Sequence, residues 1–249
     1  MPTPFYHLSL AEELLQLPDI PVHVCIRLQN HWPDFLLGNT AADVQTISGQ
    51  SRRTTHFFDL PLRNKDMLPW LKMRTVYPEL SELKSLPESK SVFLLGYYCH
   101  LQADWLWVKN IFVPVFGLNA RWKTLHHRLY LHNVLRAYLD FQLLPGLPAN
   151  IGEQLSLAQP SKWLPFVDDL HLFTWRDFLV KQLAPGALVQ TVEVFAARQG
   201  ISPKNYYSLL ESEESLDQEI FAHLPRQAIG QYRQQVLSEN LALLRQLFC

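Results

Sequence analysis

Two residues of one short segment, His100 and Asp104, could act together chemically. They lie four residues apart, so on a helix their side chains point to the same side, one turn from each other. An imidazole and a carboxylate presented in this way can bind one metal ion of the zinc class from a single rigid element. The spacing leaves an alternative open, in which Asp104 forms a core hydrogen bond with His100 or an ion pair with Lys109 or an arginine.

The segment that carries this pair, residues 91–110, is apolar on nearly all sides. A helix of that kind belongs in the middle of a helical bundle rather than on its surface. A carboxylate placed there must be paired, protonated or bound to a metal, because an isolated buried charge is very costly. The context of Asp104 therefore favours a metal site.

The elements that must position this pair are helices. Apolar residues recur at helical intervals over residues 8–15, 134–143 and 229–248. Glycine is scarce, with 9 residues, and the 17 prolines fall mostly between these stretches, where helices end. We therefore predict an all-α, multi-helix bundle. Residues 144–148, which are rich in Pro and Gly, predict a boundary between a metal-binding helical domain at 1–144 and a helical extension at 149–249, packed on the first part.

Charge and composition exclude several classes of protein. Lys and Arg number 22 against 23 Asp and Glu, which argues against a large basic surface, so no nucleic-acid partner is expected. The most apolar stretch contains too many polar residues to predict a transmembrane segment. The first residues lack the basic start of an export signal. Together with three isolated cysteines, Cys25, Cys99 and Cys249, these features predict a cytoplasmic protein with reduced thiols.

Four pieces of the amino-terminal half, taken in order, carry a resemblance to a known family. They are residues 7–12 (HLSLAE), 37–43 (LGNTAAD), 53–57 (RTTHF) and 93–104 (FLLGYYCHLQAD). Together they resemble the zinc-dependent phospholipase C family, which is related to single-strand-specific zinc nucleases, over about residues 1–140. The resemblance implies an all-helical fold in which zinc ions, normally three, lie in a cleft and cleave phosphodiester bonds.

The resemblance also implies a set of ligands. Carried over by position, Asp43, His56, His100 and Asp104 would surround one metal ion. Asp104 would also bridge to a second ion near His7, so one or two zinc ions, or other divalent metals, are expected. Close metal pairs can activate water and stabilise a phosphoryl transition state. Asp43 would orient that water or accept its proton, which makes it the candidate catalytic residue.

The sequence departs from the family's pattern after the central helix. No further histidine ligand follows Asp104 closely, and no later His-x-x-x-acid pair is present. The local substitutes for an additional metal site are His126, His127 and His132, against the alternative of an ordinary helix rich in His and Arg. Arg52 and Arg53 could hold a phosphate by bidentate hydrogen bonds, or could be ordinary surface arginines.

Two functional hypotheses follow from these residues. The first is a metal-dependent, phosphodiesterase-like hydrolase that acts on a phospholipid head group or another small phosphoester through a metal-activated water. The second is a non-catalytic, metal-stabilised helical protein with a binding or structural role, which has lost part of the trinuclear site. A third alternative, a metal-free apolar or lipid-binding bundle, reduces His100 and Asp104 to a core pair and leaves the ordered matches unexplained.

Overall fold

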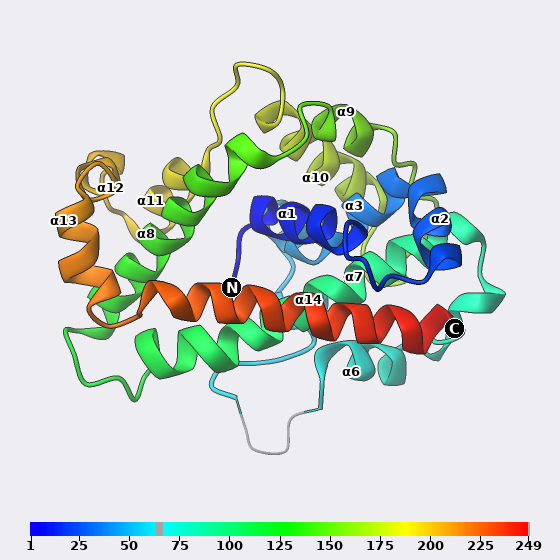
Figure 1. Cartoon of the computed structure of the whole chain (residues 1–249), viewed down its shortest axis with the longest axis horizontal. Coiled ribbons are helices and arrows are strands. Elements are labelled where there is room, and N and C mark those ends of the chain that lie inside the picture. The colour runs from blue at the N-terminus through cyan, green and yellow to red at the C-terminus, as the bar shows by residue number, and fades with distance from the viewer. Residues whose placement is uncertain (63–66, 249) are drawn as a thin grey trace.

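The computed structural model describes residues 1–62 and 67–248, and every regular element within them is a helix (Figure 1). The α-helices are α1 (Pro4–Leu15), α2 (Val22–Asn30), α3 (Trp32–Ala41), α4 (Gln45–Ser48), α5 (Arg52–His56), α6 (Pro69–Val76), α7 (Glu88–Trp107), α8 (Leu125–Leu143), α9 (Ile151–Ser156), α10 (Asp169–Gln182), α11 (Thr191–Gln199), α12 (Pro203–Leu210), α13 (Glu213–Leu216) and α14 (Arg226–Phe248). Shorter 3₁₀ or π-helical turns are η1 (Ala42–Val44), η2 (Pro78–Leu80), η3 (Leu83–Ser85), η4 (Val108–Phe116), η5 (Leu144–Gly146) and η6 (Asp217–Phe221). The predicted all-α fold is confirmed.

Helix α7 lies at the centre of the molecule. Every one of its residues from Ser91 to Trp107 is buried, as an apolar run without a polar face requires. It packs against α3, α14 and α6, and α1 covers the junction between α3 and α14. Figure 1 shows α14 crossing the whole molecule, with α1 beside it. The His100–Asp104 pair therefore sits on the most enclosed element of the fold.

The sequence predicts that this helix ends near residue 110, but α-helical geometry stops at Trp107. The chain continues as the π-helix η4, which contains Pro114 and buries Val108, Ile111 and Phe116. A π-helix accommodates more residues in each turn than an α-helix does. A continuous apolar run therefore stays buried here although the period of its side chains changes.

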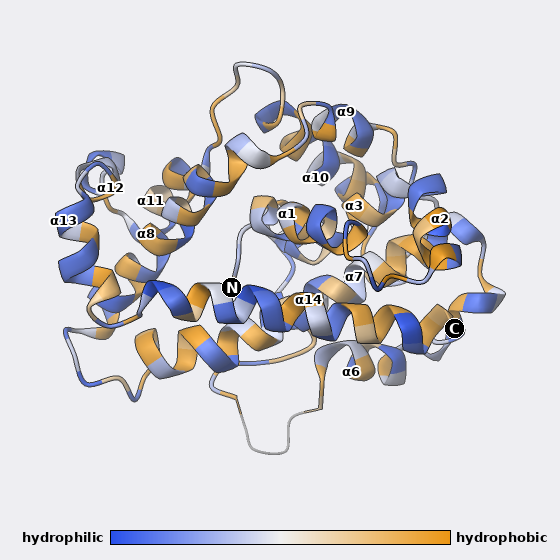
Figure 2. Ribbon diagram, viewed as in Figure 1, coloured by the Kyte–Doolittle hydropathy of each residue, from blue (hydrophilic) through white to orange (hydrophobic). Residues whose placement is uncertain are grey.

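The outer helices follow the predicted periodicity. Helices α8 and α14 coincide with the apolar repeats, and α14 buries one face that includes Tyr232, Val236 and Leu244. Figure 2 shows hydrophobic and hydrophilic colours alternating along α14, as an amphipathic helix requires. Trp175 and Tyr232 share one buried apolar cluster with residues of the amino-terminal half. The boundary at residues 144–148 stays a prediction.

In the described part of the chain, no helix combines the length and the apolar character that a membrane span needs.

Candidate metal centre

Five side chains converge from four parts of the fold. Helix α7 presents His100 and Asp104 one turn apart. Asp43 lies in η1, directly after α3, and His56 is the last residue of α5. His7 lies on α1, which begins well because Thr3 caps its amino terminus and Pro4 occupies its first position. The structure thus brings together all five residues predicted as metal ligands.

Two glycines allow α3 and α7 to approach closely enough for this convergence. An added Cβ on Gly38 would lie 2.0 Å from the carbonyl oxygen of Phe93, and one on Gly96 would lie 2.4 Å from the carbonyl oxygen of Phe35. Neither glycine has a left-handed backbone, so the requirement is closeness alone. The crossing of the two helices places Asp43 beside the ligands of α7.

The hydrogen bond that fixes His100 also sets its tautomer. Its Nδ1 lies 2.8 Å from the carbonyl oxygen of Asn39 on α3. A carbonyl only accepts hydrogen bonds, so Nδ1 carries the proton and Nε2 has a free lone pair. Backbone carbonyls hold the imidazole ligands of many metal sites in this way. His100 is therefore oriented as a ligand through Nε2.

His56 is held by its own local turn. Its Nδ1 lies 2.9 Å from Oγ1 of Thr55, and the carbonyl oxygen of Thr55 accepts a hydrogen bond of 2.7 Å from the hydroxyl of Tyr97 on α7. Phe57 ends the helix in a left-handed conformation, with a φ of 61°. These contacts lock the short helix α5 onto α7 and point Nε2 of His56 toward His100.

Nε2 of His56 lies at ligand spacing from donor atoms of three other residues. Nε2 of His56 lies 3.4 Å from Nε2 of His100, 3.4 Å from Oδ1 of Asp43 and 3.2 Å from Oδ2 of Asp104. Nε2 of His100 lies 3.7 Å from the same oxygen of Asp104. Zinc bonds of about 2.0–2.1 Å in a tetrahedron put neighbouring donors about 3.3–3.4 Å apart. Donor atoms of Asp43, His56 and His100 form one group close enough to hold an ion, and those of His7, His100 and Asp104 form another.

His7 stands on the other side of Asp104. Its ring stacks on that of His100 at 3.8 Å, and its Nε2 lies 3.3 Å from Oδ1 of Asp104. Both of these atoms are buried and have no hydrogen-bond partner. Buried polar atoms without a partner are costly and call for a ligand, so the cluster fits a cation on this side too. Because His100 has only one free nitrogen, a second ion would have fewer protein ligands than the first.

The charge state of the cluster suits a divalent cation. Burial raises the pKa of Asp43, but hydrogen bonding with His56 and the charge of His100 outweigh it and lower the pKa to about 2. Burial lowers the pKa of His100 to about 3. Burial opposes ionisation of Asp104 as well, yet the neighbouring imidazoles and Arg52 hold its pKa well below the ordinary value. At neutral pH the two carboxylates are ionised and His100 is neutral, as metal binding requires.

Of the two arginines predicted to bind phosphate, only Arg52 reaches the cluster. Its Nη2 donates a hydrogen bond of 2.5 Å to Oδ2 of Asp104, and its guanidinium lies over the ring of Phe58 at 4.7 Å. Its Nη1 is buried and has no hydrogen-bond partner. Arg53 is exposed and points elsewhere, with Asp59 at 3.5 Å.

The three histidines of α8 are not brought together. His132 is buried and accepts a hydrogen bond of 2.9 Å from Nε1 of Trp107. His126 is exposed, and Nε2 of His127 lies 3.4 Å from Oε2 of Glu219. Among the residues that the structure describes, the groups with metal-ligand geometry contain only His7, Asp43, His56, His100 and Asp104.

The cluster is reached from one side. The side chains of His7, His56, His100 and Asp104 are 1% exposed or less, whereas Asp43 and Arg52 are 18% and 25% exposed. Asp43 and Arg52 both line a cavity of about 260 Å³. This cavity therefore gives a molecule access to the exposed parts of Asp43 and Arg52.

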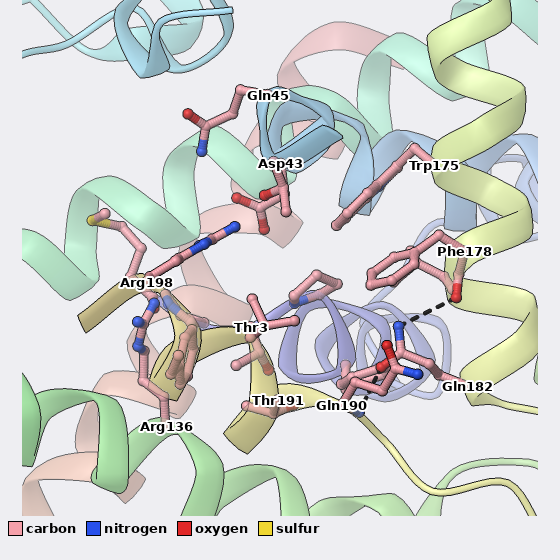
Figure 3. A pocket seen from close by; sticks show the side chains of 18 of the residues that line it. Thr3, Asp43, Gln45, Arg136, Trp175, Phe178, Gln182, Gln190, Thr191 and Arg198 are labelled. Carbon is pink, nitrogen blue, oxygen red and sulfur yellow. Dashed lines mark hydrogen bonds between the residues drawn. The ribbon is translucent and has the colours of Figure 1, made fainter. Parts of the chain in front are cut away.

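The cavity is completed by residues that carry no sequence signal of a site. Arg136 of α8, Trp175 of α10 and Arg198 of α11 line it together with Asp43 (Figure 3). The sequence presents Arg136 only as the residue four positions after His132, and Trp175 and Arg198 as parts of ordinary helices. No local spacing links them, because the fold alone brings α8, α10 and α11 to the ligands.

Fold and cluster together define a class: an all-helical protein with a buried cluster of His and Asp side chains that could hold a metal ion. The sequence model of the family described as zinc dependent phospholipase C matches residues 3–110, which confirms the resemblance to that family over this part of the chain. The matched part holds all five clustered ligand residues, and the family match points to a metal-dependent hydrolase. No curated protein and no solved structure matches the chain.

Proposed function

We propose that this protein is a zinc-dependent phosphoester hydrolase whose ion is held by Asp43, His56, His100 and Asp104. The observation that carries the proposal is that Nε2 of His56 lies 3.2–3.4 Å from donor atoms of Asp43, His100 and Asp104. Beside them, Nε2 of His7 and Oδ1 of Asp104 are buried without hydrogen-bond partners, 3.3 Å from each other. A hydrogen-bonded core pair of His100 and Asp104 does not account for that set, because the donors come from three separate elements.

The exposure of each ligand residue determines the role that we assign to it. A divalent ion bound here supplies a Lewis acid and an activated water for attack on phosphorus. His56 and His100 are fully buried and serve as ligands only. Asp43 is the ligand that also reaches the cavity, so we assign it the orientation of the attacking water and acceptance of its proton.

Arg52 completes the reacting site. Its Nη1 is unpaired and its side chain lines the same cavity as Asp43. A guanidinium in that position can donate to a phosphoryl oxygen while its Nη2 keeps its bond to Asp104. We propose that a phospholipid head group or another small phosphoester is the substrate, because the cavity is slightly smaller than the ~300–1,000 Å³ of pockets that hold drug-sized ligands.

One observation favours a second candidate function. The four proposed ligands would occupy every position of a tetrahedron, and closed sites of this kind are typical of structural zinc, whereas catalytic zinc keeps a position open. In that case the ion would cross-link η1, α5 and α7 and add directly to the free energy of folding.

The test is hydrolysis of bis(p-nitrophenyl) phosphate with zinc, manganese or cobalt added, in the wild type and in Asp43→Asn. Loss of a metal ligand that also positions the attacking water should lower kcat by about 100-fold or more. Asp140→Asn, which changes a buried carboxylate outside the cluster, is the matched control and should keep the wild-type rate. Bound zinc that raises Tm without any turnover would instead support the structural role.

A further inference from the structure

One wall of the cavity beside the metal centre carries more positive charge than the proposed reaction uses. Arg52, Arg136 and Arg198 line it, and Asp43 is the single carboxylate among the lining residues. Figure 3 shows Arg136 and Arg198 side by side on one side of the cavity, with Asp43 further along the same wall. Arg52 has a carboxylate partner in Asp104, and the other two arginines remain to be explained.

Arg136 and Arg198 have no acidic partner. Within residues 1–62 and 67–248, no carboxylate oxygen lies within ion-pair distance of either guanidinium. Arg136 donates to the carbonyl oxygen of Met1 at 3.0 Å and to the amide oxygen of Asn133, and it lies over the ring of Phe195 at 4.0 Å. Its Nε is buried and has no hydrogen-bond partner.

The two guanidiniums also affect each other. Burial lowers the pKa of Arg136 to about 10. The charges of Asp43, Asp140 and Asp104 raise this pKa, and the charge of Arg198 lowers it further. Two like charges in a partly enclosed site repel each other, and an anion between them removes the repulsion while filling unused donors. Arginine is suited to this, since its planar fork matches a carboxylate or a phosphate.

The opposite wall defines the rest of the ligand. Trp175 and Phe178 of α10 face the arginines across the cavity (Figure 3), and Leu179 of the same helix also lines it. The indole N–H of Trp175 already donates to the carbonyl oxygen of Thr40 at 2.9 Å, so the indole offers the cavity an apolar surface. A ligand that fills this space has charged groups toward α8 and α11 and an apolar part toward α10.

Charge balance gives the number of those groups. A divalent ion is neutralised by Asp43 and Asp104, and the single negative charge of a phosphodiester is matched by Arg52. Two positive charges are then left, on Arg136 and Arg198. We propose, on the basis of the proposed function, that the substrate carries a second anionic group, a phosphate or a carboxylate, and that Arg136 and Arg198 bind it.

The experiment compares three p-nitrophenyl phosphodiesters that differ only in a terminal hydroxyl, carboxylate or phosphate. In the wild type, charge-assisted hydrogen bonds to the terminal carboxylate or phosphate should raise kcat/KM by about 10- to 100-fold over that of the hydroxyl compound. The larger increase is expected for whichever of the two anions the site prefers. Arg198→Gln, a change at an exposed position that leaves the core intact, should reduce this preference by about 10-fold or more. Arg136→Lys tests the half-buried partner, and Arg121→Gln, an exposed arginine away from the cavity, is the control that should keep the preference.

Equal kcat/KM for all three compounds in the wild type would overturn the proposal, as would an unchanged preference in Arg198→Gln. The carboxylate and phosphate arms identify which anion the site takes. If none of the three is hydrolysed, the proposed hydrolase function fails, and calorimetric binding of the same compounds decides this proposal separately. Tighter binding of a charged compound that is lost in Arg198→Gln supports the anion site, and equal affinities overturn it.

Discussion

Replacing Gly38 by alanine should disturb the metal centre without touching any ligand. The new Cβ would lie 2.0 Å from the carbonyl oxygen of Phe93, roughly 1.4 Å short of the 3.4 Å at which van der Waals contact becomes ordinary. That oxygen belongs to the backbone of α7 and cannot rotate away. Helices α3 and α7 must therefore separate by an ångström or more at this crossing.

The magnitude follows from that displacement. Overpacking of a well-packed core costs about 1–3 kcal/mol and occasionally more, and a clash between two backbones belongs at the upper end. For a chain of this size, 1 kcal/mol lowers Tm by about 2–4 °C, so Tm should fall by about 6–12 °C. Metal sites tolerate changes of only about 0.2 Å in ligand distance, so zinc affinity should fall by about 10-fold or more, because Asp43 moves away from His100.

The assay combines thermal unfolding with zinc competition against a chromophoric chelator. Gly230→Ala is the matched control: Gly230 lies within α14, and an added Cβ there meets no heavy atom within 4 Å. That variant should gain about 0.5–1 kcal/mol and keep its zinc affinity. A Gly38→Ala protein with wild-type Tm and wild-type zinc affinity would refute the reasoning that the glycine contact of α3 and α7 sets the ligand geometry.

Two further predictions concern buried charges away from the centre. Burial raises the pKa of Asp140 from 3.8 to about 7 although Thr3 and Thr191 donate hydrogen bonds to it. Because the folded-state pKa of Asp140 is raised, the contribution of Asp140 to stability is complete below pH ~4 and is lost as pH rises through ~7. Urea titrations should show that Asp140→Asn lacks this decline. An identical pH profile in the wild type and the variant would contradict the raised pKa of Asp140. Arg128 is buried and donates to carbonyl oxygens of Trp122, Lys123 and Gly117 at 2.8–2.9 Å. Arg128→Met should cost about 3 kcal/mol in urea unfolding, because it leaves carbonyls unpaired, whereas exposed Arg121→Met should cost almost nothing; equal losses would remove the proposed role of Arg128.

Local patterns in the sequence are enough to predict the elements that carry the ligands. The apolar periods of α8 and α14, and the all-round apolar run of α7, depend on neighbouring residues of one helix, so they are visible without the fold. The pairing of His100 with Asp104 is also local. The approach of Asp43 and His56 to that pair is not, and only the resemblance to a family predicted it.

Other features lie beyond what spacing can reveal. His126 and His132 are six residues apart, which on a helix turns their side chains to different faces. His132 accordingly points into the core toward Trp107, and His126 is exposed. The cavity wall joins Arg136 and Arg198 to Asp43 across long stretches of chain, and no sequence period describes such a contact.

The central claim is that the cluster of Asp43, His56, His100 and Asp104 binds a metal ion, and elemental analysis tests it most directly. The chain would be expressed without a histidine tag and purified without chelators beside Asp104→Ala and the control Asp140→Asn. We predict at least one zinc ion per chain in the wild type and in the control, and none in Asp104→Ala. A folded wild type that contains no metal and takes up no added zinc would contradict the claim and reduce His100 and Asp104 to a core pair.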